Sequence, residues 1–176
     1  MIAQSKIKFR IKSMSSILMD RYSGINDSND AEARKNALEK VYRDDDGNIC
    51  LPAYVLKACI RTGARDIGKK LECKKREQSI RAGLYFTQNN YSIGKTEPDD
   101  IHGEIVTRKG TGNKVTRVVS YRPLINEWEV ECECVLYDLT PEFIRQAIEL
   151  SGFRYGLLGH RPEYGRFKLL EFETME

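Results

Sequence analysis

The final quarter of the chain, from Asn126 to Glu173, constrains the fold most, because a strand pattern and a helix pattern follow one another there directly. In the segment EWEVECECVLYDL, apolar residues alternate with glutamates, which is typical of a strand with one buried face. The segment TPEFIRQAIELSG predicts a helix, with Thr140 as its cap, Pro141 at its first position and Gly152 just past its end. A glycine-rich loop then leads to a closing strand, RFKLLEFE. A strand, a helix and a strand in this order are half of a ferredoxin-like sandwich.

We therefore expect an α+β fold: a ferredoxin-like or RRM-like antiparallel sheet with helices on one face and an inserted basic β-hairpin. The 176 residues suffice for one domain with its own core, which we expect to span 1–176 with insertions at about 15–50 and 83–122. No apolar run approaches the roughly 18–20 residues that a membrane span needs, and the N-terminus is polar. We expect no membrane contact and a cytoplasmic protein.

Five cysteines lie mostly within apolar patterns, so buried free thiols in a reducing compartment explain them best. Cys132 and Cys134 have the spacing of a short metal clip, but strand alternation accounts for them equally. We expect no metal and no cofactor.

The opening strand has an apolar face and a basic face, the latter including Lys8 and Arg10. Two interpretations stay open. The basic face is either a solvated face that resists edge pairing, or an open sheet surface on which a strand of nucleic acid lies.

Pro52 opens the main helix, which the pattern predicts from Ala53 to about Leu71. Its basic residues recur every four positions and share one face: Lys57, Arg61, Arg65 and Lys69. A solvated face is the simpler interpretation. Because no acidic i,i+4 partner interrupts this stripe, contact with a polyanion is the alternative that we favour.

The segment RKGTGNKVTR predicts a glycine-tipped hairpin, which either grips a phosphodiester backbone or is an ordinary surface loop. Its basic residues are Arg108, Lys109, Lys114 and Arg117. Several aromatic residues are candidates for stacking on bases, although core positions are as compatible with them: Tyr85, Phe86, Tyr91, Tyr155 and Tyr164.

The chain offers little for catalysis. It has two histidines and lacks GxSxG, HExxH and GxxxxGK[ST]. His160, beside Arg161 in the glycine-rich loop, is a conceivable acid–base group but more simply a hydrogen-bonding or stacking residue. The polar connection from Ser13 to Asp30 contains Asp20 and Asp27. Asp30 is most simply the cap of a short helix from Ala31 to Lys40.

Three segments resemble the RAMP superfamily of CRISPR proteins, most of all the branch that forms the repeating backbone of effector complexes. They are IKFRIKSMSSILMD, ICLPAYVLKACIRTGAR and GLLGHRPEYGRFKL. In the middle segment, the strand, proline and basic helix of the family are matched at Leu51, Pro52, Leu56, Lys57, Ile60 and Arg61. The segments SSILMD and HRPEYGRF are also similar to those of short phage and prophage proteins.

The resemblance implies a domain that binds one strand of nucleic acid, RNA or DNA, and assembles side by side along it as a homo-oligomer or with effector-complex subunits. Some backbone subunits cut RNA with an aspartate in the loop after the first strand, and Asp20 or Asp27 lies in the comparable loop. We therefore carry three hypotheses: a non-enzymatic binding protein, a metal-dependent ribonuclease using residues Asp20 to Asp30, and a phage structural or assembly protein. For the first, phosphate contacts are expected from the basic groups named above and from His160, Arg161 and Arg166.

Overall fold

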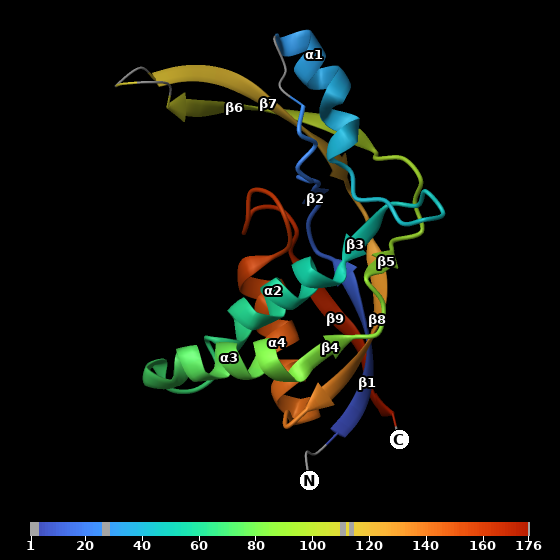
Figure 1. Ribbon diagram of the computed structural model, residues 1–176, viewed down its shortest axis with the longest axis vertical. Helices are drawn as coiled ribbons and strands as arrows, with labels where there is room; N and C mark the ends of the chain where they lie inside the picture. The colour runs from blue at the N-terminus through green and yellow to red at the C-terminus, as the bar shows by residue number, and fades with distance from the viewer. Residues whose placement is uncertain (1–3, 26–28, 110–111, 113–114, 176) are drawn as a thin grey trace.

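The computed structural model describes residues 4–25, 29–109, 112 and 115–175. Its main sheet has four antiparallel strands in the order β4-β8-β1-β9. The strands are β4 (Leu84–Phe86), β8 (Glu129–Tyr137), β1 (Gln4–Ser13) and β9 (Phe167–Met175). The helices α2 (Ala53–Ala64) and α4 (Pro141–Leu150) cover one face of this sheet, and α3 (Cys73–Gly83) packs beside α2 (Figure 1). This confirms the ferredoxin-like α+β fold, with the first strand at the centre of the sheet.

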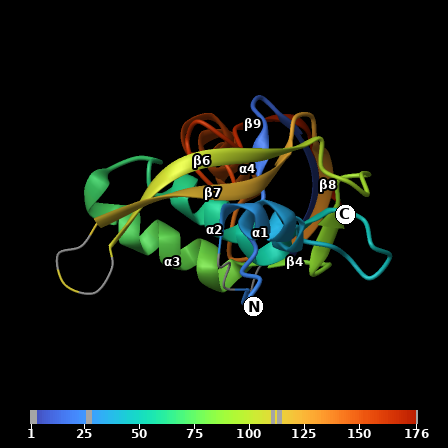
Figure 2. The ribbon, with the colours of Figure 1, turned by 90° about the horizontal axis from the view of Figure 1, so that it is seen from above.

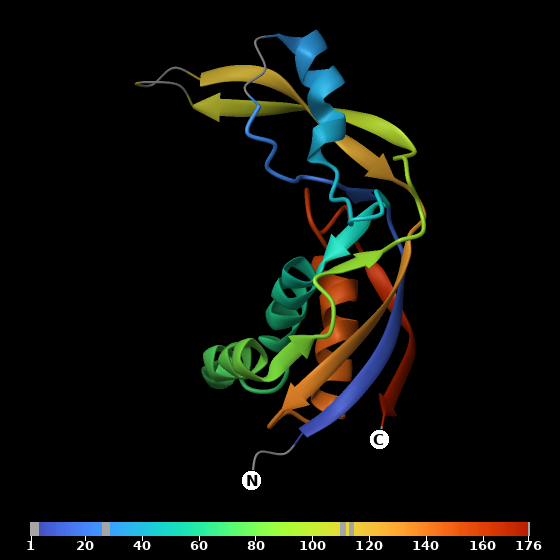
Figure 3. The same ribbon diagram turned by 45° about the vertical axis from the view of Figure 1, so that its right-hand side comes forward.

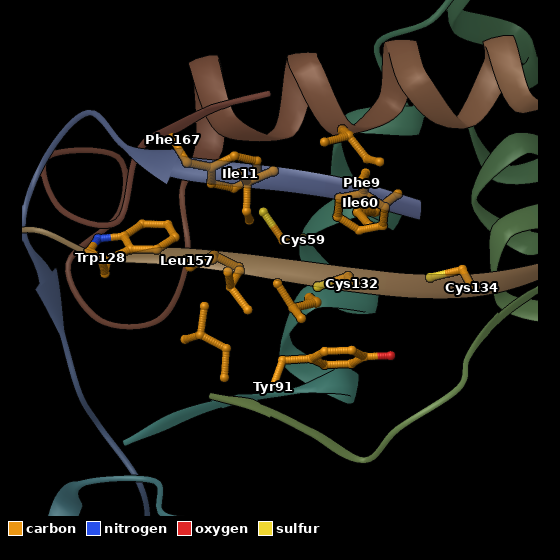
Figure 4. Packing of buried hydrophobic residues seen from close by; sticks show 14 of the residues in the cluster. Phe9, Ile11, Cys59, Ile60, Tyr91, Trp128, Cys132, Cys134, Leu157 and Phe167 are labelled. Carbon is orange, nitrogen blue, oxygen red and sulfur yellow. The ribbon is translucent and has the colours of Figure 1, made fainter. Parts of the chain in front are cut away.

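The alternation in the sequence places the core where it was expected. Phe9 of β1 and Cys132 of β8 lie opposite each other and point toward the helices (Figure 4). Trp128 and Phe167 close the core at one end, with ring centroids 6.1 Å apart. Four free cysteines are buried, as expected: Cys50, Cys59, Cys132 and Cys134.

The two insertions come together in space, which the sequence did not indicate. The first contains β2 (Ile17–Leu18), α1 (Asp30–Lys35) and the 3₁₀ turn η1 (Asn36–Lys40). The second contains β6 (Asp100–Lys109) and β7 (Val115–Ile125), which pair along their length as the expected hairpin. Strand β2 pairs with β7, so that the three strands form one sheet in the order β2-β7-β6. Figure 2 shows β6 and β7 side by side above the helices. We call this unit the hairpin module.

Side chains join the two insertions within the hairpin module. The Lys40 ammonium donates to the Tyr121 carbonyl at 2.8 Å, and the Tyr121 hydroxyl donates to Asp30 at 2.9 Å. A further pair, β3 (Cys50–Pro52) and β5 (Asn90–Ser92), links the module to the main body. Strand β4, which follows α3 directly, belongs to the main sheet.

Two helix boundaries differ from the expectation. Helix α2 ends at Ala64, not near Leu71, and is followed by the 3₁₀ turn η2 (Lys70–Glu72) and by α3. The Arg76 guanidinium of α3 donates to the carbonyls of Ala64, Arg65 and Lys69 at 3.1, 3.3 and 2.7 Å. It thus satisfies acceptors that the end of a helix leaves unpaired.

The short helix begins one residue earlier than expected and is capped by Asn29, whose side chain accepts from the Glu32 N–H at 3.0 Å. Its second half is the 3₁₀ turn η1. Among the described helices, none is long and apolar enough to cross a membrane.

Candidate nucleic-acid interface

The glycine-rich stretch 156–165, called here the glycine loop, is held in one conformation by backbone contacts. The Leu157 N–H donates to the Gly165 carbonyl at 2.9 Å, which closes the loop on itself. A Cβ at Gly165, where φ is +75°, would lie 2.1 Å from the Leu157 carbonyl oxygen, so only glycine fits there. Strand β2 and the residue before it hold the other side of the glycine loop. The Gly165 N–H donates to the Ser16 carbonyl at 2.8 Å, and the Gly159 N–H donates to the Leu18 carbonyl at 3.2 Å.

Two residues of the loop other than glycine adopt left-handed backbone conformations, Leu158 with φ 60° and His160 with φ 51°. Such conformations are disfavoured for residues with a Cβ and cluster at functional sites. The outlier at His160 directly precedes Arg161, so the strained segment is the one that presents a cation to solvent.

The glycine loop lies between α2 and the base of the hairpin (Figures 1 and 3). On the α2 side, the Cys59 thiol donates to the Gly156 carbonyl at 3.2 Å, and burial raises the pKa of Cys59 to about 12, which keeps this donor protonated. On the hairpin side, His160 Nδ1 lies 2.9 Å from Glu104 Oε2 of β6. The rings of His102 and Tyr164 lie 5.5 Å apart. Loop and hairpin are therefore positioned relative to each other.

Three cations on or beside the glycine loop and on the hairpin have no acidic partner in the described part of the chain, namely Arg117, Arg161 and Arg166, whereas Arg122 of β7 pairs with Asp20. Arg161 is exposed and Arg117 of β7 is exposed. The Arg166 guanidinium lies 5.1 Å from the Phe153 ring centroid, where it is held without being neutralised. Arg108 and Lys109 occupy the end of β6, opposite Thr116 and Val115. Lys114 lies outside the described residues.

The basic stripe of α2 does have an acidic partner, contrary to the sequence argument. Glu77 of α3 lies 3.1 Å from Arg61 and 3.8 Å from Arg65. Lys57 packs over Tyr85, with its ammonium 4.8 Å from the ring centroid. Lys69 is exposed but lies beyond the end of α2, so it does not extend the stripe. Glu77 follows Arg65 by 12 residues and Arg61 by 16 in the sequence, and only the packing of α3 on α2 brings it to them.

The open face of the main sheet carries opposite charges in register rather than a cationic track. Lys8 pairs with Glu131 at 2.7 Å, and this hydrogen bond raises the pKa of Lys8. Arg10 lies between Glu129 of β8, at 3.1 Å, and Glu171 of β9. The antiparallel register brings the acidic faces of β8 and β9 to both sides of the basic face of β1. This arrangement favours the interpretation of that face as solvated.

The aspartates of the connection after β1 bind neighbouring side chains. Asp20 pairs with Arg122 at 3.3 Å, and the Arg122 side chain is only 15% exposed. Asp30 accepts from the Tyr121 hydroxyl, as described above. Asp27 lies outside the described residues. Where side chains are described, no group of three or more His, Cys, Asp or Glu residues is placed to hold a metal ion.

The aromatic candidates range from buried (Tyr91) through half-buried (Phe86, Tyr155 and Tyr164) to exposed (Tyr85). Tyr91 is buried and donates to the Glu133 carbonyl at 3.0 Å, and Phe86 packs on the core. The Tyr155 hydroxyl donates to Asp66 at 2.8 Å. Tyr85 is the exception, with 51% of its surface exposed.

The strand order, the helices on one face and the long inserted hairpin define a ferredoxin-like α+β fold. One solved structure of this fold is the type III-B Cmr-beta complex bound to cognate target RNA, with a TM-score of 0.53 at 14% identity over 98% of this chain. Among solved structures, Cmr6 from Pyrococcus furiosus also matches, with a TM-score of 0.47 at 12% identity, covering 96% of this chain and 99% of that one. This chain spans 61% of the length of the Cmr-beta chain that it matches. No protein-family model and no curated protein matches the sequence.

Proposed function

We propose that this protein binds single-stranded nucleic acid along the side that carries the glycine loop and the hairpin. The observation that supports this most is the placement of Arg161 and Arg166, which have no carboxylate partner among the described residues, on a loop held against the base of a basic hairpin. Cations that are positioned but not neutralised can contact phosphates without first breaking ion pairs. Further exposed lysines lie at η2 and on α3 and add to the positive charge of the protein surface: Lys69, Lys70, Lys74 and Lys75.

We expect the protein to bind RNA more tightly than single-stranded DNA. We also expect it to assemble side by side along the RNA, with copies of itself or with other subunits. The support is the RAMP fold, since a structure with this fold contains a target RNA. The pairing of Asp20 with Arg122 favours a structural role for that loop over hydrolysis.

Binding of the wild-type protein to a fluorescent single strand should weaken steeply with salt. If five phosphates are neutralised, the slope of log K against log salt concentration should be about −3.5, because each contact on a single strand contributes about −0.7. Anisotropy titrations with RNA and DNA strands of equal length, at several salt concentrations, measure this slope. A protein with no affinity for either strand at low salt would contradict the proposal.

Lys8→Ala combined with Arg10→Ala should leave the affinity for single strands within about threefold of wild type, because those cations already pair with glutamates and lie on the opposite face of the sheet. The same anisotropy titration measures the affinity of this double variant. A loss of tenfold or more would show that the strand lies on the open sheet instead.

A further inference from the structure

A pocket of about 500 Å³ opens between the first turn of α2 and the turn that joins β4 to β5, and none of its lining residues belongs to the glycine loop or the hairpin. One wall of the pocket is formed by the first turns of α2 and the residue before them: Pro52, Ala53, Tyr54 and Lys57. From the opposite side it is lined by β4 and by the turn 88–90, and Tyr42 contributes to its wall. The backbone closes its rim, since the Ala53 N–H donates to the Asn89 carbonyl at 2.8 Å. The volume is in the range of sites for small organic groups.

Two tyrosines on this pocket expose their rings to solvent. Tyr54 is 64% exposed. Its side chain is nevertheless restrained, because its hydroxyl donates to the Tyr42 hydroxyl at 3.2 Å and the two rings pack edge to face. Tyr85 comes from the edge strand β4 and is held by Tyr137, whose ring lies 5.5 Å away, nearly perpendicular. Both rings are therefore held in place. Most of the Tyr54 surface is uncovered, whereas Lys57 lies over one face of the Tyr85 ring and leaves about half of that residue exposed. Planar groups stack favourably on such surfaces.

The polar groups of the pocket suit a flat ligand with hydrogen-bonding edges. Gln88, Asn89 and Asn90 are exposed, and their side-chain amides have no hydrogen-bonding partner in the described part of the chain. An amide offers a donor and an acceptor side by side, the pattern that pairs with the edge of a base. Lys57 lies at the wall without a carboxylate partner among the described residues. Burial lowers the pKa of Lys57, and Arg61 and Arg81 lower it further, so a nearby anion or carbonyl oxygen would stabilise its charge.

We infer that this pocket takes one unstacked nucleobase, with its ring on Tyr54 or Tyr85 and its edge against the amides of residues 88–90. An apolar peptide side chain has no hydrogen-bonding edge to offer the amides or Lys57, and an inorganic anion has no flat surface to stack on the two rings. The inference rests on the proposed function, because the base belongs to the strand that the loop and the hairpin bind. The inference goes beyond the proposed function because it assigns the protein a contact with a base in addition to its contacts with phosphates.

The test compares two double variants on two strands. Tyr54→Leu with Tyr85→Leu removes both stacking faces, while Tyr54→Phe with Tyr85→Phe keeps them and removes only the hydroxyls. The strands are a single-stranded oligoadenylate and an abasic strand of the same length, which has the phosphates without the bases. We expect the leucine variant to bind oligoadenylate about 5- to 150-fold more weakly and the abasic strand as well as wild type does. The phenylalanine variant should stay within about threefold on both.

Equal losses on the two strands, or no loss on either, would overturn the inference, and unchanged melting temperatures would show that the variants fold. If the wild-type protein binds neither strand, the proposed function fails, and saturation-transfer NMR with adenosine monophosphate then decides on the pocket. Transfer to the base protons that the leucine variant abolishes would support a nucleobase site. Absence of transfer to the wild-type protein would overturn it.

Discussion

A variant with Arg117→Ala, Arg161→Ala and Arg166→Ala should bind single-stranded RNA about 100-fold more weakly than wild type at about 0.1 M salt. Each of the three cations lacks an acidic partner in the part of the chain that is described, so each is available to a phosphate. Losing three contacts should also make the salt slope shallower by about two. Fluorescence anisotropy at several salt concentrations measures both quantities together.

The matched control removes the same formal charge from the opposite face, by Lys6→Ala, Lys8→Ala and Arg10→Ala. These residues alternate along β1 and point away from the helices, and two of them pair with glutamates. If the two triple variants lose affinity equally, binding reflects only net charge and the interface proposed here is wrong. If only the control loses affinity, the strand lies on the sheet.

Gly63→Ala should lower the free energy of unfolding by about 2 kcal/mol or more, because α2 and α4 touch at that position. A Cβ on Gly63 would lie 2.4 Å from the Ala147 carbonyl oxygen and 2.8 Å from the Ser151 backbone nitrogen. Both are backbone atoms, so the two helices would have to separate. Separation also strains the hydrogen bond from the Ser151 hydroxyl to the Cys59 carbonyl, which is 2.9 Å long.

Alanine favours a helix over glycine by roughly 1 kcal/mol, so the steric cost must exceed that gain for the prediction to hold. Thermal unfolding measures the result, and a drop of about 4–8 °C is expected for a chain of this length. Thr62→Ala, at the neighbouring position of α2, is the control and should change the stability far less. An unchanged or raised melting temperature for Gly63→Ala would show that the helices are not as close as the structure places them.

The elements with strong local signals are those that the sequence predicts well. The period of two in β8 and β1 places each buried side chain without reference to the rest of the chain. Thr140 caps α4 as expected, since its side chain accepts from the Phe143 N–H at 3.4 Å. Such patterns depend on residues within one or two turns of one another, and a sequence shows those directly.

The interface depends instead on partners that are distant along the chain. The α2 stripe appeared unneutralised because Glu77 belongs to another helix, and the basic face of β1 appeared open because its glutamates arrive on β8 and β9. The position at which α2 ends also depends on a distant residue, since the Arg76 guanidinium of α3 donates to the carbonyls of Ala64 and Arg65.

The sequence by itself determined the fold class, the glycine loop and the basic hairpin. Only the tertiary structure decided which cations keep a free charge, that the two insertions form one module against the glycine loop, and that Tyr54 and Tyr85 flank a common pocket. The reason is that buried periodicity is a local property, whereas neutralisation of a charge depends on whichever carboxylate packing brings within about 4 Å.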